Sequence, residues 1–183
     1  MPVSAVVGRP GSGKSFVLTS IALRNMKRGR QVFANFDIEG AHRFDLSQMA
    51  DLPPGLVIVD EAQNWFHSRM WSGMPEDMLE RWSQTRKAGW DVYLGTQHES
   101  NLDAVVRRVV QWGWLLEPRW SMITPGQRPL YIYGRRWDFP YFRSTLKGKR
   151  PVQRRRWWWS WDVARAYDTF EVTRLRGREG VAS

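Results

Sequence analysis

The strongest constraint on this chain is an eight-residue motif near its N-terminus. Residues Gly8 to Ser15 read Gly-Arg-Pro-Gly-Ser-Gly-Lys-Ser and match G-x-x-x-x-G-K-[ST] in full. The motif follows a short apolar run, Val3–Val7, which is typical of a buried strand. From Lys14 to about Lys27 the apolar residues are arranged as in a largely buried helix. A strand, a glycine-rich loop and a helix in this order predict the phosphate-binding loop of an α/β protein.

The chemistry expected at this loop follows from its residue types. Glycines allow successive backbone N–H groups to curl around phosphate oxygens at the positive end of the helix. Lys14 is expected to reach the outer phosphates of ATP, and the Ser15 hydroxyl to bind Mg²⁺. A chance glycine-rich turn would not explain the position between a strand and a helix. The expected nucleotide-binding residues are Gly8, Arg9, Pro10, Gly11, Ser12, Gly13, Lys14, Ser15 and Phe16.

A second apolar run, Leu56–Val59, ends in two acids, Asp60 and Glu61. Asp60 is suited to hold the water shell of Mg²⁺, and Glu61 to act as the general base that deprotonates the attacking water. Alone, two acids after a strand could be solvated loop residues. Beside a phosphate loop they favour ATP hydrolysis over phosphoryl transfer to a substrate, since kinases and GTPases usually lack the second acid.

The order of further elements narrows the fold class. A helix and a strand, residues 75–96, lie between the acidic pair and Thr96-Gln97, which is typical of P-loop ATPases of the additional-strand type. We therefore expect a three-layer α/β core with a mainly parallel sheet, and residues 37–55 to be irregular. Pro125-Gly126-Gln127 predicts a hairpin turn. The other expected elements are strands at Gln31–Phe36, Val92–Leu94 and Val109–Leu116, helices at Pro75–Lys87 and Leu102–Val106, hairpin strands at Trp120–Thr124 and Leu130–Tyr133, and a helix or strand at Val163–Val172.

Two more side chains are candidates for catalysis. Gln97 ends the strand at Val92–Leu94, where its amide can sense the γ-phosphate or position water; bonding to local backbone is the alternative. Arg86 lies at the end of a predicted helix, where it can neutralise transition-state charge in a neighbouring subunit or stabilise the helix C-terminus. Arg107 and Arg108 compete with Arg86 for the first role.

Positive charge is concentrated in the C-terminal part of the chain. Residues 1–134 carry 15 Lys/Arg against 13 Asp/Glu, and residues 135–183 carry 13 against 5. We expect residues 1–134 to form an ATPase core with a hairpin. Residues 135–183 are expected to form a basic, Trp-rich arm of the same domain, irregular over 135–161. Its blocks of Arg, Lys and Trp favour nucleic-acid binding, with a subunit or capsid contact, a lipid surface or a solubilising face as alternatives.

Composition excludes several classes of protein. The chain has no Cys, so disulfides and thiolate metal sites are impossible, and its three His are too far apart for a metal-binding helix pair. The N-terminus has no signal-peptide pattern, and no run of about 18 apolar residues predicts a transmembrane helix. The expected location is the cytosol or the inside of an assembling particle.

Several blocks of the sequence resemble one known family. The phosphate loop, residues 59–69, residues 85–97 and the late Ala166–Phe170 occur in the order seen in the zonular occludens toxin (Zot) family, which includes assembly ATPases of filamentous phages. The Arg-x-x-Gly…Thr-Gln block, from Arg86 to Gln97, also resembles the FtsK/HerA group of DNA-pumping motors. The stronger part of the resemblance covers residues 3–116.

This resemblance implies a ring-forming ATPase, expected as a homo-hexamer, that moves viral DNA. Arg86 would then act on the neighbouring subunit, and capsid or virion membrane proteins are further expected partners. Zot-like proteins usually continue into a transmembrane helix and a second domain, and this sequence reaches Ser183 with neither. That departure favours a soluble genome-packaging motor over a membrane-anchored export ATPase. An alternative of a different class is an ATP-dependent assembly switch, which would bind ATP with little hydrolysis.

Overall fold

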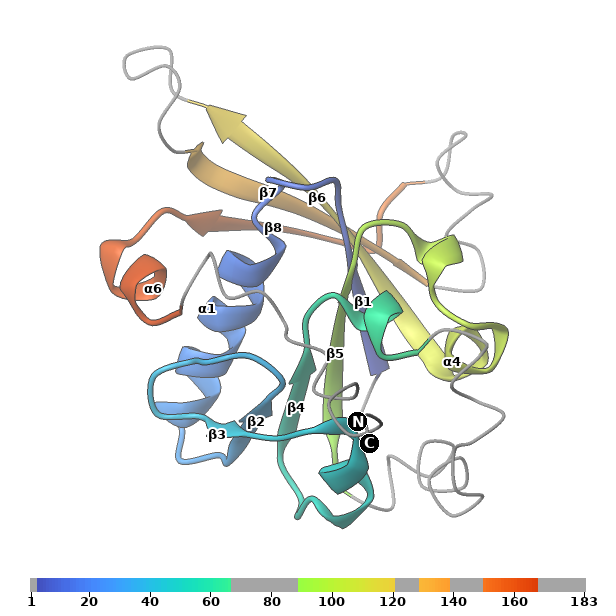
Figure 1. Cartoon of the computed structure of the whole chain (residues 1–183). Helices are drawn as coiled ribbons and strands as arrows, with labels where there is room; N and C mark the ends of the chain where they lie inside the picture. The colour runs from blue at the N-terminus through green and yellow to red at the C-terminus, as the bar shows by residue number, and fades with distance from the viewer. Residues whose placement is uncertain (1–2, 67–88, 121–128, 139–149, 168–183) are drawn as a thin grey trace, which may run out of the picture.

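The described part of the chain forms one eight-stranded sheet with helices on both of its faces (Figure 1). A computed structural model describes residues 3–66, 89–120, 129–138 and 150–167. The strands follow the order β3-β2-β4-β5-β1-β6-β7-β8 across the sheet. They are β1 Val3–Val7, β2 Val32–Ala34, β3 His42–Arg43, β4 Leu56–Val59, β5 Asp91–Thr96, β6 Val110–Trp120, β7 Pro129–Asp138 and β8 Gln153–Trp158.

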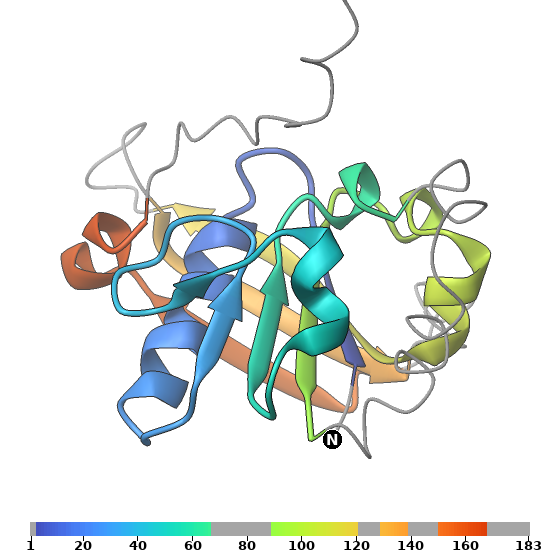
Figure 2. The same cartoon turned by 60° about the horizontal axis from the view of Figure 1, so that its bottom comes forward.

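The central strands β1, β2 and β4 are buried at every position because both faces of the sheet are covered. α1, Lys14–Met26, packs on one face, where Phe16, Leu18 and Ile58 belong to one buried cluster. The opposite face carries a second buried cluster that includes Phe66 and Trp90. The helices on that side are η1 Leu46–Asp51, η2 Ala62–Asn64, η3 Glu99–Asn101 and α4 Ala104–Val109. α1 and α4 lie on opposite sides of the central strands (Figures 1 and 2).

The additional strand is confirmed. β5 lies between β1, which leads into the glycine-rich loop, and β4, which ends in the two acids. It pairs in parallel with both neighbours, with Val3 opposite Val92 and Leu56 opposite Asp91. Three parallel strands therefore end at the same edge of the sheet. This edge collects the glycine-rich loop, the acidic pair and Gln97.

The expected elements differ from the structure mainly in their extent. The strand predicted at Val109–Leu116 is β6, which continues to Trp120. Of the first hairpin strand predicted at Trp120–Thr124, the residues after Trp120 lie outside the described part of the chain. Residues 37–55 were expected to be irregular, and they contain β3 and η1. The predicted helix at Leu102–Val106 is α4, which begins at Ala104. The helix predicted at 75–87 and the turn at 125–127 lie outside the described residues.

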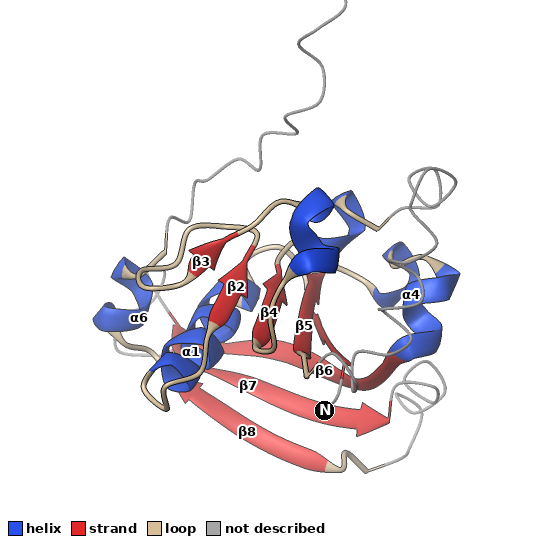
Figure 3. Ribbon diagram, turned by 90° about the horizontal axis from the view of Figure 1, so that it is seen from below, coloured by secondary structure: helices blue, strands red, loops and turns tan. Residues whose placement is uncertain are grey.

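The prediction of an irregular arm over 135–161 is wrong for most of its described residues. Arg135–Asp138 belong to β7, and Gln153–Trp158 form β8, an antiparallel strand in which Trp158 pairs with Tyr131. The boundary expected between residues 134 and 135 therefore falls inside β7. The antiparallel ribbon of β6, β7 and β8 continues the parallel core (Figure 3).

The sequence of β8 does not show the alternation of polar and apolar residues that is typical of a strand, because an arginine lies on its inner side. Arg155 and Trp157 lie on the same side of the strand, facing α1, and the guanidinium of Arg155 is 5.2 Å from the Trp157 ring centroid. The aliphatic stem of an arginine can cover apolar surface while its charged end remains near water. The run Arg-Arg-Arg-Trp-Trp therefore shows no period of two in polarity, although the strand has one in burial.

The chain continues from the ribbon back to the core. A short helix, α6, spans Trp161–Arg165 and packs near α1. Beyond it, the backbone N–H of Glu39 donates to the carbonyl of Ala166 at 2.9 Å, and Tyr167 forms a bridge with Ile38. The helix or strand predicted at Val163–Val172 is thus a helix only in its first residues; those after 167 lie outside the described part. Among the helices that the structure describes, none has the length and apolar character needed to cross a bilayer.

The adjacent residues Trp157 and Trp158 provide a matched test of the position of β8. Trp157 is 5% exposed and packs edge-on against Trp114, whereas Trp158 is 59% exposed. We expect Trp157→Ala to lower the free energy of unfolding by about 3–5 kcal/mol and Trp158→Ala by less than about 1 kcal/mol. Urea denaturation followed by far-ultraviolet circular dichroism measures both values. Equal losses would contradict the described register of β8.

Candidate functional site

The loop from Gly8 to Ser15 connects the carboxyl end of β1 to the first turn of α1. Its backbone is held to the sheet and to itself: the N–H of Gly8 donates to Thr96 O at 3.2 Å, and the N–H of Ser12 to Arg9 O at 3.0 Å. Gly11 and Gly13 have φ of 74° and 85°, which only glycine adopts without strain. The loop thereby curls over the N-terminus of α1, where free backbone N–H groups favour anions.

Lys14 is fixed at the centre of this loop. Its side chain is 6% exposed, and its ammonium donates to the carbonyl of Gly8 at 3.2 Å. The same nitrogen lies 3.9 Å from Oε1 of Glu61. A buried cation is therefore held between the phosphate loop and the acidic pair, in the position expected for Lys14 to meet the outer phosphates of a nucleotide.

Asp60 joins the end of β4 to the start of α1. The Ser15 hydroxyl donates to Oδ2 of Asp60 at 2.5 Å, and the N–H of Glu61 donates to Oδ1 at 2.9 Å. Burial raises the pKa of the Asp60 carboxyl above its ordinary value, and the neighbouring Glu61 raises it further. The bonds from Ser15 and from the backbone N–H, together with the Lys14 charge, oppose this shift.

The donor set at Asp60 and Ser15 fits Mg²⁺. Mg²⁺ prefers oxygen ligands and is commonly held by one or two protein groups together with substrate phosphates and water. A carboxylate and a hydroxyl in direct contact, at the foot of a phosphate loop, are such a pair. Within the described part of the chain, no cluster of three or more His, Asp or Glu side chains could hold a metal by itself. Ser15 and Asp60 would therefore share the ion with a nucleotide.

Glu61 has an unusual backbone conformation. Its φ and ψ are both 46°, and among the described residues it is the one non-glycine residue with a positive φ. Such a conformation costs of order 1 kcal/mol and persists only where the surroundings impose it. The Glu61 carboxylate is 34% exposed and is contacted by the side-chain amide of Gln63. It is thus held at the site and remains open to water.

Gln97 lies beside Glu61, as the order of the strands predicts. Its amide nitrogen is 3.4 Å from Oε2 of Glu61, a long hydrogen bond between two exposed ends of strands. The preceding Thr96 is buried, and its hydroxyl donates to the carbonyl of His98 at 3.0 Å. This bond fixes the turn after β5 and leaves the Gln97 amide directed towards the acidic pair.

Sequence reasoning missed the residue that positions Asp60. Asn35 is 3% exposed; its amide donates to Asp60 O at 2.9 Å, and its carbonyl accepts from Asp60 N at 2.8 Å. Gly95 is equally specific, because a Cβ there would lie 2.4 Å from Oδ1 of Asp60. The available signal was a polar Asn within the apolar run that forms β2 and continues to Phe36.

The remaining candidates are not all at the site. The side chain of Phe16 stacks on Trp159 at 4.9 Å, in the core, so any contact of Phe16 with phosphate would come from its backbone N–H. Arg107 and Arg108 lie in the last turn of α4. Arg86 is outside the described residues, and its role stays a prediction.

The middle of the chain matches a known protein family. The sequence model of the family described as Zonular occludens toxin (Zot) matches residues 38–119. The Gene 1 protein of Enterobacteria phage I2-2 is 28% identical over 140 residues, which make up 60% of this chain and 38% of that protein. For the Gene 1 protein of Salmonella phage IKe the identity is 28% over 137 residues, or 58% of this chain and 37% of that protein. The matches cover well under half of each relative's length, and they confirm the resemblance to Zot-like proteins.

Solved structures share the fold over most of the chain. The N-terminal domain of zonular occludens toxin from Neisseria meningitidis has a TM-score of 0.59 at 19% identity, covering 91% of this chain and 98% of that domain. The DNA-packaging ATPase B204 from Sulfolobus Turreted Icosahedral Virus has a TM-score of 0.56 at 13% identity, covering 85% and 96%. Its counterpart from Sulfolobus turreted icosahedral virus 2, in complex with ATP-gammaS, has a TM-score of 0.54 at 12% identity, with the same coverage of both chains. The P-loop NTPase fold is thereby confirmed.

Removal of the Asn35 amide tests how Asp60 is held. In Asn35→Ala, the partly buried N–H and carbonyl of Asp60 lose these partners, which costs about 1–3 kcal/mol of unfolding free energy. We also expect weaker binding of a fluorescent ATP analogue, because Asp60 and Ser15 would no longer be in register. Asn25→Ala is the matched control: Asn25 is a half-buried residue of α1 that bonds to Ile21 O and Arg30. Unchanged nucleotide affinity in Asn35→Ala would show that Asn35 does not position the site.

Proposed function

We propose that this chain hydrolyses ATP and that Glu61 is the general base. The observation that carries this proposal is the convergence of five side chains at one edge of the sheet. The Glu61 carboxylate lies 3.9 Å from the Lys14 ammonium and 3.4 Å from the Gln97 amide. Beside it, Asp60 accepts the hydrogen bond from Ser15.

The phosphate loop provides the seat for the nucleotide. Its free N–H groups and the Lys14 ammonium face the position of the β- and γ-phosphates. The Ser12 hydroxyl is buried, and within the described residues it has no hydrogen-bond partner. A buried hydroxyl without a partner is uncommon in folded proteins, and a phosphate oxygen would satisfy it. When bound at Ser15 and Asp60, Mg²⁺ would neutralise charge that develops on the phosphates.

Glu61 and Gln97 would act on the attacking water in different ways. A half-exposed carboxylate can accept a proton from water, and the neighbouring Gln97 amide can hold that water or contact the γ-phosphate. Lys14 contacts Glu61 in this structure, and the same ammonium is available to phosphate oxygens. Phosphate binding at the loop would therefore change the contact between Lys14 and Glu61, and with it the position of the Glu61 carboxylate.

We further propose that ATP turnover moves viral DNA during particle assembly. The sequence relatives are phage Gene 1 proteins, and the fold is shared with a viral DNA-packaging ATPase. Packaging into a particle and export from the cell both need this activity and remain the two forms of the proposal. It includes a homo-oligomeric ring, expected as a hexamer, in which Arg86 of one subunit acts on the nucleotide of its neighbour.

Two substitutions separate nucleotide binding from hydrolysis. Lys14→Ala should weaken ATP binding by roughly 10- to 150-fold, because a charge-assisted hydrogen bond contributes about 1.5–3 kcal/mol. Glu61→Gln should bind ATP normally and lose about 10²- to 10⁴-fold in turnover, the usual contribution of a general base. Titration with a fluorescent ATP analogue and a phosphate-release assay, each with and without DNA, measure the two effects.

Glu39→Gln is the matched control for Glu61→Gln. Glu39 is an exposed residue beside α6, so its variant should retain both binding and turnover. Wild-type turnover in Glu61→Gln would remove Glu61 as the base. ATP binding by the unsubstituted protein with negligible hydrolysis, even with DNA added, would identify an assembly switch in place of a motor.

A further inference from the structure

The three-stranded ribbon has two faces of different character. Its inner face packs on α1 and includes Ile132 and Trp157, which are 1% and 5% exposed. The register of the ribbon places every other residue on the opposite side, which we call the outer face. Its residues are Leu115, Glu117 and Arg119 of β6, Tyr131, Tyr133, Arg135 and Trp137 of β7, and Arg154, Arg156 and Trp158 of β8.

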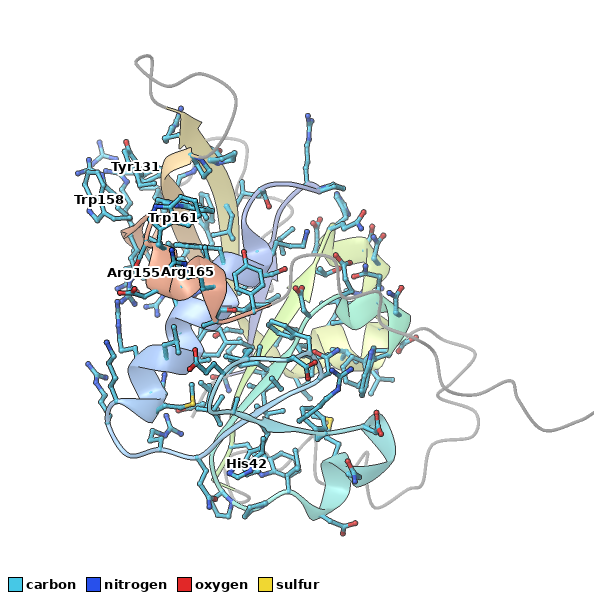
Figure 4. All side chains as sticks on the ribbon, turned by 60° about the vertical axis from the view of Figure 1, so that its left-hand side comes forward. His42, Tyr131, Arg155, Trp158, Trp161 and Arg165 are labelled. Carbon is cyan, nitrogen blue, oxygen red and sulfur yellow. The ribbon has the colours of Figure 1, made fainter. Side chains whose placement is uncertain are left out.

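The outer face combines aromatic rings with cations. The Tyr131 and Trp158 rings are 5.0 Å apart, and the Arg156 guanidinium lies 5.6 Å from the Tyr131 ring centroid. Arg119 is similarly placed over Tyr133, at 5.9 Å. Figure 4 shows Tyr131 and Trp158 beside each other at one end of the ribbon.

This end of the outer face is open. Along the same face, Trp137 is buried in the core cluster that contains Phe66 and Trp90. Towards the other end, Trp158 is 59% exposed, and both Arg154 and Arg156 are exposed. The described ring neighbour of Trp158 is Tyr131, which belongs to the same face. An aromatic side chain this exposed, with cations around it, is typical of a binding surface.

The charges on the outer face select an anionic partner. Arg119 and Arg135 share the carboxylate of Glu117. Arg154 and Arg156 have no carboxylate partner among the residues that the structure describes, so their charge is available to a ligand. They lie two residues apart on one strand, about 7 Å along its axis, a spacing that can follow successive phosphates. The surface thus pairs uncompensated cations with an exposed ring.

We propose that the outer face binds single-stranded nucleic acid. Bases would stack on Trp158 and Tyr131, and phosphates would contact Arg154 and Arg156. Stacking on Trp158 needs an exposed base face, which a duplex does not offer, so single strands are favoured. The inference rests on the proposed function in taking DNA as the ligand class, and it adds the strand type and the surface that holds it. It does not involve the nucleotide site.

The three consecutive tryptophans at the end of β8, Trp157, Trp158 and Trp159, have different roles. Trp157 packs in the core against Trp114, and Trp159 stacks on Phe16 of α1, so both hold the ribbon to the protein. Trp158 makes no comparable contact with the core and is the ring that projects from the ribbon. A substitution at Trp158 therefore tests binding without removing a residue that the fold needs.

Fluorescence anisotropy with a labelled oligo-dT of about 20 nucleotides, in the absence of ATP, tests the proposal. Stacking contributes about 1–3 kcal/mol per base, so Trp158→Ala should weaken binding roughly 5- to 150-fold, and Trp158→Phe should restore much of it. Arg154→Ala/Arg156→Ala should reduce the slope of log affinity against log salt by about 1.4, or 0.7 per phosphate contact. The matching duplex should be affected less by Trp158→Ala.

The controls separate this proposal from the proposed function. Arg24→Ala/Arg28→Ala removes two exposed cations near the end of α1 and should leave the salt slope unchanged. Glu61→Gln should keep oligonucleotide binding even where ATP turnover is lost, and all outer-face variants should keep DNA-free turnover and the wild-type melting temperature. Unchanged affinity and salt slope in Arg154→Ala/Arg156→Ala would overturn the proposal. So would losses that appear only in self-association or in binding to vesicles of anionic lipid, which would assign the outer face to a subunit contact or a membrane surface.

Discussion

The hydrogen bond between Ser15 and Asp60 determines how the other parts of the site must be arranged. The Asp60 carboxylate lies in the interior, where burying an ionised group without partners costs several kcal/mol of folding free energy. The fold meets this cost locally: Asn35 of the segment after β2 fixes the backbone of Asp60, and Gly95 of β5 leaves room for its carboxylate. Three neighbouring strands are thereby held in register around one acid.

The same bond connects the two motifs that the sequence makes most visible. Ser15 belongs to the first turn of α1 and Asp60 to the end of β4, and their contact sets the distance between the phosphate loop and Glu61. The strained backbone of Glu61 follows from this arrangement, since the chain must turn sharply after Asp60 to keep both carboxylates at the site. Its φ of 46° is thus tied to the position of Asp60.

Local patterns predicted the parts of the protein that depend on local chemistry. The glycine-rich loop, the apolar runs of β1 and β4 and the strand inserted between them follow from residue type, spacing and order, and the structure places Lys14 and Glu61 together as expected. Asn35 was missed because its role depends on which strand lies next to β2, which no local pattern reports. The ribbon strand β8 was missed because cation–π contacts let arginines occupy both of its sides.

Ile132 of β7 is in contact with the phosphate loop: a Cβ on Gly13 would lie 2.1 Å from its Cδ1. Two residues along the inner face, Gly134 lies under the ring of Trp157. The ribbon therefore rests directly on Gly13, the residue that precedes α1, and a shift of β7 would change this contact. Thermodynamic linkage makes such a contact symmetric: if a ligand on the ribbon changes the affinity for nucleotide by some factor, nucleotide must change the affinity for that ligand by the same factor.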